Sequence, residues 1–362
     1  MVEWKKLGDV CKTVSPPKKL EKELYGNVGL YPIIDQGQKE IVGFTDDLTA
    51  LLPYGEYVLF GDHTRFVKYY RGKFAQGADG LKILKANESI IPRYFFYVFD
   101  NTEVPSRGYS RHWSIAKQLL IPIPSLSEQQ RIVSILDTFT SSISNLKQQI
   151  EERRKQYEYE RDLLLDLEGK EGVEMKKLGE VGDICMCKRI MKDQTSEKGD
   201  IPFFKIGTFG GKADAYISRE LFEDYKEKYS YPKKGEILIS AAGTIGRTVV
   251  FNGEDAYFQD SNIVWISNNE QLVLNTFLRY LYGVIDWKID GGTIKRLYNY
   301  NLKNATIYVP TLQAQSRIVS ILDTFEQSIS NLEEQLAMRE KQYEYYRNQL
   351  LTFEGEEERG KT

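Results

Sequence analysis

Histidine and cysteine are scarce in this sequence, with two histidines and three cysteines among 362 residues. Three cysteines are too few for a disulfide framework. Cys185 and Cys187 form a C-x-C pair, but no second ligand pair and no histidine lies nearby, whereas tetrahedral zinc needs four ligands. We therefore expect Cys11, Cys185 and Cys187 to be ordinary thiols and predict no metal site.

Long apolar runs are also missing. No run approaches the roughly 18 residues that a membrane helix needs, and the N-terminal residues Met1–Lys6 contain no apolar signal core. We therefore expect a cytoplasmic protein that does not contact a membrane.

A charge excess is missing as well, since the net charge is only -3. The charge is unevenly divided: residues 1–125 carry a balance of +3 and residues 175–311 a balance of +2, whereas residues 126–168 and 312–362 are acidic. Weakly basic modules on an acidic frame favour binding of a polyanion by the modules. The balance argues against a sequence-independent nucleic-acid coat, which is usually strongly basic.

Common catalytic and nucleotide-binding motifs do not occur. The segment Ser240–Thr248 approaches a P-loop, but Ala241 stands at the first glycine position and Arg247 at the lysine position. G-x-G-x-x-G, H-E-x-x-H, G-x-S-x-G and the Asn-Pro-Pro-Tyr of adenine methyltransferases are all lacking. Both histidines, His63 and His112, lie in the first half, although a duplicated enzyme is expected to keep its acid-base groups in both halves. We interpret the chain as a binding protein; an enzyme built around His63 or His112 is an alternative.

A long internal repeat organises the chain. Arg131–Phe139 returns unchanged as Arg317–Phe325, and 24 of 35 positions are identical between residues 131–165 and 317–351, at a constant offset of 186. A period this long indicates a domain duplication. The segments before the two copies barely resemble each other. We predict recognition modules at 1–125 and 175–311, helices at 126–168 and 312–354, a linker at 169–174 and a tail at 355–362.

Each repeat predicts one long helix with a heptad seam. Apolar positions are separated by alternating steps of four and three, which is typical of a left-handed coiled coil. Ser125 and Thr311 are possible N-caps, Ser125 and Glu128 have capping-box spacing, and Gly169 and Gly355 are expected to end the helices. The seam consists of Ile132, Leu136, Phe139, Ile143, Leu146, Ile150, Arg153, Tyr157, Glu160 and Leu164, and of Ile318, Leu322, Phe325, Ile329, Leu332, Leu336, Arg339, Tyr343, Tyr346 and Leu350.

The two matched seams favour antiparallel pairing within one chain, and pairing between two chains is the alternative. The seam arginines, Arg153 and Arg339, either fix the register or extend their charged ends to solvent.

The two modules share one plan. Each opens with Lys-Lys-Leu-Gly, at 5–8 and 176–179, and has a proline- and glycine-containing turn before a strand, at 53–59 and 232–239. We predict further strands at 65–70, 81–84, 248–251 and 263–266, helical segments at 92–99 and 272–282, and final strands ending at 121–124 and 307–310. The fold class is therefore α+β: two mixed α/β recognition domains separated by two long antiparallel helices, which form an intramolecular coiled coil with pseudo-two-fold symmetry.

Polar and basic residues in the glycine-rich loops are the candidates for DNA contact. Arg and Lys can donate to guanine O6 and N7, and Asn and Gln can pair with adenine. For any single residue the alternative is a solvated polar loop. The candidates are His63, Arg65, Gln76, Arg107, Tyr109, Ser110, Arg111 and His112 in the first module, and Lys188, Arg189, Ser240, Thr244, Arg247, Gln259, Ser261, Asn262, Thr293, Lys295 and Arg296 in the second.

The segments Ile121–Leu136 and Ile307–Leu322, each placed after such a module, strongly resemble the specificity subunit of type I DNA restriction-modification systems. The resemblance covers nearly the whole chain. One departure is the segment Gln313–Ser316 of the second copy, which puts the capping box there in doubt.

The resemblance implies that each module reads one half of a split double-stranded DNA sequence in the major groove and that the paired helices set the gap. It also implies two methyltransferase subunits and restriction/translocase subunits as partners. S-adenosylmethionine, ATP and magnesium are then expected on those partners, and this chain binds no cofactor. A coiled-coil adaptor whose modules bind proteins is the alternative function.

Overall fold

The computed structural model describes residues 2–78, 80–108, 110–290 and 295–353. By internal contacts it divides into two compact units, one formed by residues 1–148 with 333–362 and the other by residues 149–332. We call them the N-terminal unit and the C-terminal unit. Each contains one module together with part of both long helices.

Each module contains a four-stranded antiparallel sheet with the same strand order, β2-β8-β5-β6 in the N-terminal unit and β11-β17-β14-β15 in the C-terminal unit. The central strands β5 and β14 are nearly continuous runs of buried residues, as expected for strands covered on both faces. The strands are β2 (Cys11–Val14), β8 (Leu81–Ala86), β5 (Gly55–Gly61), β6 (Val67–Gly72), β11 (Gly182–Cys185), β17 (Ile263–Asn268), β14 (Ile237–Ser240) and β15 (Thr248–Val250).

Two smaller sheets complete each module. In the three-stranded sheets, β3 pairs antiparallel with β4 and parallel with β7, and β12 pairs in the same two ways with β13 and β16. In the two-stranded sheets, the first and last strands of each module pair, so that the module closes where its long helix begins. The strands are β1 (Glu3–Lys6), β9 (Leu120–Ile123), β3 (Tyr31–Ile34), β4 (Gly43–Thr45), β7 (Ala75–Gln76), β10 (Glu174–Lys177), β18 (Thr306–Val309), β12 (Ile201–Phe204), β13 (Tyr216–Ile217) and β16 (Tyr257–Phe258).

Short helices cover the sheets. The predicted helical segments are present as α1 (Pro92–Asp100) and α5 (Asn275–Val284), and both bury aromatic and aliphatic side chains. Helix α4 (Arg219–Lys228) belongs to the C-terminal unit and has Ser218 as its N-cap. The described residues of the N-terminal unit form no equivalent helix. The remaining short helices are α2 (Trp113–Ala116), α6 (Asn299–Asn304) and the 3-10 turns Leu7–Asp9, Lys22–Leu24, Leu48–Ala50, Leu178–Glu180 and Lys192–Gln194.

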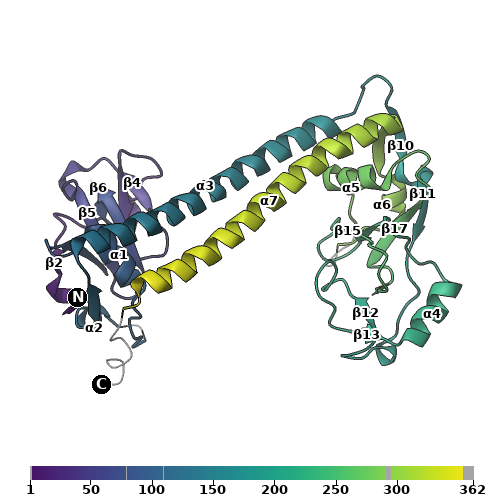
Figure 1. Cartoon of the computed structure of the whole chain (residues 1–362). Coiled ribbons are helices and arrows are strands. Elements are labelled where there is room, and N and C mark those ends of the chain that lie inside the picture. Colours follow the sequence, from purple (N-terminus) through teal and green to yellow (C-terminus); the bar gives the residue numbers. More distant parts are fainter. Residues whose placement is uncertain (1, 79, 109, 291–294, 354–362) are drawn as a thin grey trace. The chain divides into compact units, whose positions relative to one another are not determined.

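The repeated elements form helices α3 (Leu126–Leu165) and α7 (Leu312–Leu351), which lie side by side (Figure 1). In the N-terminal unit the rings of Phe139 and Tyr346 stack with centroids 5.3 Å apart, and Lys147 pairs with Glu340 at 2.9 Å. Since residue numbers rise along α3 while those of the contacted residues fall along α7, the pairing is antiparallel. The predicted fold class, including the intramolecular coiled coil, is confirmed.

The predicted seam faces inward. Every seam residue except Tyr346 is buried or half-buried, whereas positions such as Asn145 and Gln149 are exposed. The two seam arginines stack on aromatic rings, Arg153 on Phe325 at 5.8 Å and Arg339 on Phe139 at 5.7 Å from the centroid. Arg339 is the repeat equivalent of Arg153, and Phe325 is the repeat equivalent of Phe139. The two contacts are therefore equivalent, as pseudo-two-fold symmetry requires.

Both long helices end a few residues earlier than predicted. Helix α3 stops at Leu165, three residues before Glu168, because Leu165 and Leu167 enter the core of the C-terminal module and Leu167 N donates to Leu165 O at 3.0 Å. Helix α7 stops at Leu351, which is buried in the core of the N-terminal module. The predicted stop at Gly355 lies outside the described residues.

The predicted capping box at Ser125 forms only in part. The Ser125 hydroxyl accepts from Glu128 N at 3.4 Å, but the carboxylate of Glu128 pairs with Arg131 at 2.7 Å. At the second helix Thr311 caps Ala314 N at 3.3 Å. The N-cap role of both residues is thus confirmed.

The core of each module continues onto the long helices. In the N-terminal unit Ile132, Val133 and Leu136 of α3 and Leu351 of α7 are buried together. The equivalent residues of the C-terminal unit are Ile318, Val319, Leu322 and Leu165. The core of each module therefore contains the first turns of one long helix and the last residue of the other. No helix among the described residues is long and apolar enough to span a membrane.

Candidate nucleic-acid interface

The predicted basic loop of the N-terminal module is anchored at the end of strand β5. His112 N donates to Asp62 O at 2.8 Å, and Trp113 N donates to the Asp62 carboxylate at 2.7 Å. The His112 ring donates from Nδ1 to Asp62 O at 3.0 Å and accepts at Nε2 from Arg107 N at 3.1 Å. This anchor leaves Arg107 and Arg111 exposed.

His112 does not have the predicted role of a DNA contact in this structure. Its side chain is fully buried, and both ring nitrogens are engaged with the backbone. The same geometry leaves the ring no free nitrogen for acid-base chemistry with a substrate. His112 instead holds the loop that carries the exposed arginines.

The C-terminal module anchors its basic loop at the equivalent place. Leu297 N donates to the carbonyl of Ala241, the residue that follows β14, at 2.9 Å. Arg296 donates from Nη2 to Ser261 O at 2.8 Å and to Asn262 Oδ1 at 3.0 Å. The structure therefore brings together three of the predicted residues, Arg296, Ser261 and Asn262.

Among the other predicted residues, Lys188, Arg189 and Lys295 are exposed. Ser110 is half-buried, and Tyr109 and Thr293 lie outside the described residues. Lys188 lies 4.9 Å from the ring centroid of Tyr229, and Arg189 forms an ion pair with Asp260 at 2.9 Å. Because the side chains of Lys188 and Arg189 are themselves exposed, both cations remain accessible to a polyanion.

Next to each basic loop lies the hairpin turn that joins the central strand β5 or β14 to the edge strand β6 or β15. In the C-terminal module Ser240 is buried, and its hydroxyl accepts from Arg247 N at 2.9 Å and donates to Thr244 O. The prediction that Ser240 contacts DNA is therefore wrong for this structure, because its hydroxyl closes the turn. Thr244 and Arg247 are exposed, and β15 rather than a helix follows the turn, which agrees with the rejection of a P-loop.

The equivalent turn of the N-terminal module contains His63 and Arg65. His63 is half-buried, whereas Arg65 is exposed and has a left-handed backbone with φ of 66°. The Arg65 guanidinium donates to Val104 O at 2.9 Å, just before the basic loop. Arg65 thus connects the hairpin turn to the loop that carries Arg107.

The two predicted glutamines have structural roles. Gln76 lies in β7 and is 2% exposed, and Gln259 accepts from Ile206 N at 2.9 Å through its side-chain oxygen. Gln76 cannot reach DNA because its side chain is inside the module, which corrects that prediction. Gln259 is half-buried and supports the loop that follows β12.

The loops after β3 and β12, residues 35–41 and 205–212, were not among the predicted sites. In the N-terminal module Gln36 accepts from His63 N at 3.2 Å and from the Thr64 hydroxyl at 2.5 Å. In the C-terminal module a Cβ at Gly210 would lie 3.1 Å from Arg247 Nη2. Each loop therefore lies against the hairpin turn, where it adds exposed polar groups such as those of Gln38, Lys39 and Lys212. The cluster of glycines at 207, 210 and 211 between two lysines was a usable sequence signal.

The cysteines are thiols, as predicted. Burial raises the pKa of Cys11 and of Cys187 to about 12, so both stay protonated near neutral pH. Cys185 is half-buried, and burial also raises its pKa. Among the described residues, no group of three or more His, Cys, Asp or Glu side chains could hold a metal ion.

Comparison with known proteins identifies the family. The model of the type I restriction modification DNA specificity domain matches residues 1–153 and 170–338. A Haemophilus influenzae protein whose assigned name is that of a type I restriction enzyme specificity subunit is 44% identical, over 97% of this chain and 96% of its own length. A type I restriction enzyme specificity subunit of Escherichia coli is 29% identical over 97% of this chain and 94% of its own length.

Solved structures share the fold. The S subunit of a type I restriction-modification system from M. genitalium superimposes with a TM-score of 0.65, at 16% identity, and the match covers 98% of this chain and 96% of that one. A chain from work on complex assembly and conformational transition of a type I R-M system gives a TM-score of 0.57, at 20% identity, with 97% and 96% covered. The two modules, the paired helices and these matches together show that the chain belongs to the type I restriction-modification DNA specificity family and has a role in sequence-specific DNA recognition.

Proposed function

We propose that each module reads one half of a bipartite double-stranded DNA sequence, with its basic loop and hairpin turn directed into the major groove. The observation that carries this proposal is the shared anchor of the two basic loops, at Asp62 in one module and at Ala241 in the other. One scaffold thus presents two different sets of basic side chains: the exposed Arg107 and Arg111 in the first module, and the exposed Lys295 with the half-buried Arg296 in the second. Guanidinium groups suit guanine O6 and N7, and different loops on one scaffold suit two different half-sites.

The paired helices set the gap between the half-sites under this proposal. A helix of 40 residues is about 60 Å long at 1.5 Å per residue. Since DNA rises by about 3.4 Å per base pair, a change of a few helical turns changes the gap by several base pairs.

Two methyltransferase subunits dock on the paired helices, and restriction/translocase subunits join them. Support comes from the repeat, because two equivalent helix surfaces can bind two copies of one partner. These partners carry S-adenosylmethionine, ATP and magnesium, and this chain contributes recognition and no catalytic residue. The complex acts on DNA in the cytoplasm.

Salt-dependent binding to DNA tests this function against the adaptor alternative. The chain is purified with its methyltransferase partner, and its affinity for duplex DNA is measured between roughly 50 and 200 mM salt, the range over which phosphate contacts lose most of their binding strength. We expect log affinity to fall linearly with log salt. An affinity that does not change with salt would support an adaptor that binds protein.

A further inference from the structure

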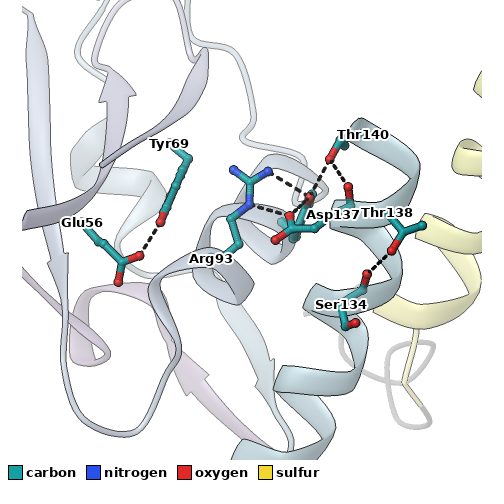
Figure 2. A network of polar contacts seen from close by, with 8 residues as sticks. Glu56, Tyr69, Arg93, Ser134, Asp137, Thr138 and Thr140 are labelled. Carbon is teal, nitrogen blue, oxygen red and sulfur yellow. Dashed lines mark hydrogen bonds and ion pairs between the residues drawn. The ribbon is translucent and has the colours of Figure 1, made fainter. Parts of the chain in front are cut away.

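A polar cluster connects α1 to α3 in the N-terminal unit (Figure 2). Arg93 Nε lies 2.7 Å from Asp137 Oδ1, and the Tyr97 hydroxyl donates to the same oxygen at 2.5 Å. Arg93 Nη2 also donates to the Tyr97 hydroxyl at 3.1 Å, and Thr140 lies 3.3 Å from that hydroxyl. We call Arg93, Tyr97 and Asp137 the N-terminal tie, because they join a helix of the module to a long helix.

The N-terminal tie also reaches the four-stranded sheet. The Arg93 guanidinium carbon lies 4.6 Å from the ring centroid of Tyr69 in β6 and 5.2 Å from that of Phe96. The Tyr69 hydroxyl in turn donates to Glu56 at 2.6 Å, as Figure 2 shows. One partly buried guanidinium thus contacts the sheet, α1 and α3 at once, and charge-assisted bonds of this kind are stronger than neutral ones.

The C-terminal unit has an equivalent cluster built from a different sequence. Arg279 Nη2 donates to Glu326 at 2.6 Å, and the Tyr280 hydroxyl donates to Asp323 at 2.6 Å. Asp323 is the repeat equivalent of Asp137. The arginine, however, precedes its tyrosine by one residue here and by four residues in the N-terminal unit. We call Arg279, Tyr280, Asp323 and Glu326 the C-terminal tie.

A pocket lies beside the N-terminal tie. In the N-terminal unit it measures about 380 Å³, and its walls include Arg93, Phe96, Thr140 and Tyr343. In the C-terminal unit an open pocket of about 510 Å³ is lined by residues of α3, α5 and β18 but by none of the four residues of the C-terminal tie. Because the N-terminal pocket is partly open to solvent, packing does not close that side of the contact between module and long helices, where Arg93 forms part of the pocket wall.

We propose that the two ties are positioning elements that fix the angle of each module on its long helices and thereby select the number of base pairs between the half-sites. The inference rests on the proposed function, because it concerns the gap between two DNA half-sites. Arg93 and Arg279 act through the module orientation and do not contact DNA in this scheme. The ties add a second determinant of the gap to the length of the helices.

Because a module extends far from its attachment to the long helices, a small tilt of the module moves its far edge by the length of one or more base pairs. A module of about 120 residues has a radius of gyration of about 14 Å, so its far edge lies roughly 35 Å from this attachment. A tilt of about 10° moves that edge by about 6 Å, which is close to two base pairs at about 3.4 Å each. A tie that limits tilting therefore sharpens the choice of gap without touching a base.

The test measures methylation by the complex of this chain with its methyltransferase subunit on a DNA library. The library keeps both half-sites constant and varies the gap by up to about two base pairs in each direction, the range that the tilt above can cover. The variants are Asp137→Asn and Tyr97→Phe, with Arg131→Gln as a matched control, because Arg131 is an exposed arginine on α3 whose ion pair with Glu128 lies within the same helix. Tyr280→Phe probes the other module.

We expect the unmodified chain and Arg131→Gln to prefer one gap. In the tie variants the preference for that gap over its neighbours falls by about tenfold, as the loss of one charge-assisted hydrogen bond allows, while the bases read in both half-sites stay the same. Tyr97→Phe removes a single hydroxyl. This variant therefore tests the effect of the tie on gap preference even if Asp137→Asn folds poorly.

An unchanged gap preference with uniformly lower methylation would overturn the proposal and leave the ties a purely structural role. A change in the bases read would overturn it as well. Absence of split-site methylation by the unmodified complex would instead contradict the proposed function on which the inference rests.

Discussion

Gln129 and Gln315, which stand 186 residues apart, make the same three hydrogen bonds. Both side chains are fully buried in the first turn of a long helix. Each side-chain oxygen accepts a backbone N–H from the residue just before α1 or α5, and each side-chain nitrogen donates to two backbone carbonyls. The partners are Ile91 N at 2.8 Å, Ser89 O at 3.1 Å and Pro124 O at 2.9 Å for Gln129, and Leu274 N at 2.9 Å, Leu272 O at 2.8 Å and Pro310 O at 2.8 Å for Gln315.

This arrangement explains why the divergent segment Gln313–Ser316 does not disturb the contact between the start of α7 and the segment before α5. Glu128 and Gln130 are replaced there by Ala314 and Ser316, but the residue with the internal role is retained. The doubt that the sequence raised about this segment concerns its surface positions only.

Replacing Gln129 with Met is expected to destabilise the N-terminal unit. The change keeps the side-chain volume and leaves one N–H and two carbonyl groups without their partner, which costs about 2–4 kcal/mol of unfolding free energy. Urea denaturation of Gln129→Met and of the control Gln130→Met, whose position is exposed, measures this. Equal midpoints for the two variants would show that the buried amide contributes nothing.

Removing one basic side chain from each module is expected to relax recognition in one half-site only. Arg111→Ala should affect the half-site of the N-terminal module and Arg296→Ala the other, each by about 1–3 kcal/mol of base discrimination. Motif mapping by methylation sequencing, with the exposed Arg219→Ala of α4 as control, reads both halves at once. An equal loss in both halves would contradict independent modules.

A matched insertion in both long helices is expected to lengthen the gap. Seven residues inserted after Ile150 and seven after the equivalent Leu336 preserve the heptad seam and add about 10 Å to each helix, which corresponds to as many as about three base pairs. The same insertion in the linker 169–174 serves as control and should leave the gap unchanged. If the doubly extended chain directs methylation at the original gap, the helices do not act as a ruler.

Stability should depend on pH through Glu236. This residue is 2% exposed and accepts from Lys233 N at 2.8 Å, and burial raises the pKa of its carboxyl group above the ordinary 4.5. The native state therefore binds this proton more tightly than the unfolded state does. The stabilisation is present in full below about pH 4.5 and is lost as the pH rises through the raised pKa.

Glu236→Gln removes this titration. The Tm of Glu236→Gln minus that of the unmodified chain should therefore become more positive between about pH 4.5 and about pH 8. Thermal unfolding followed by circular dichroism measures the difference. A constant difference across that range would show that Glu236 has the same pKa in the folded and unfolded chain.

The helices and the module plan could be predicted because their signals are local or repeated. A seam such as Ile132–Leu136–Phe139 shows its period within a few turns, and its copy at 318–325 confirms it. The strands on either side of the glycine turns carry short apolar runs, and the structure places them within a few residues of the predicted bounds.

The site could be predicted only as a set of loops. Ser240, Gln76 and His112 have polar, glycine-rich neighbours like those of the exposed Arg111, and long-range contacts decide which of them is buried. His112 is buried because it bonds Asp62, 50 residues earlier in the chain. The loop after β12 was missed because its place beside Arg247 depends on the pairing of β12 with β16, which no local pattern shows.

Methylation mapping of host DNA tests the central claim most directly. The chain is co-expressed with a methyltransferase subunit, and the methylated sites are read by single-molecule sequencing. We predict one split motif with methylated adenines on both strands, its two halves separated by a constant number of unread base pairs. A stable complex that adds no methylation, or that methylates a continuous sequence, would contradict recognition by two separate modules.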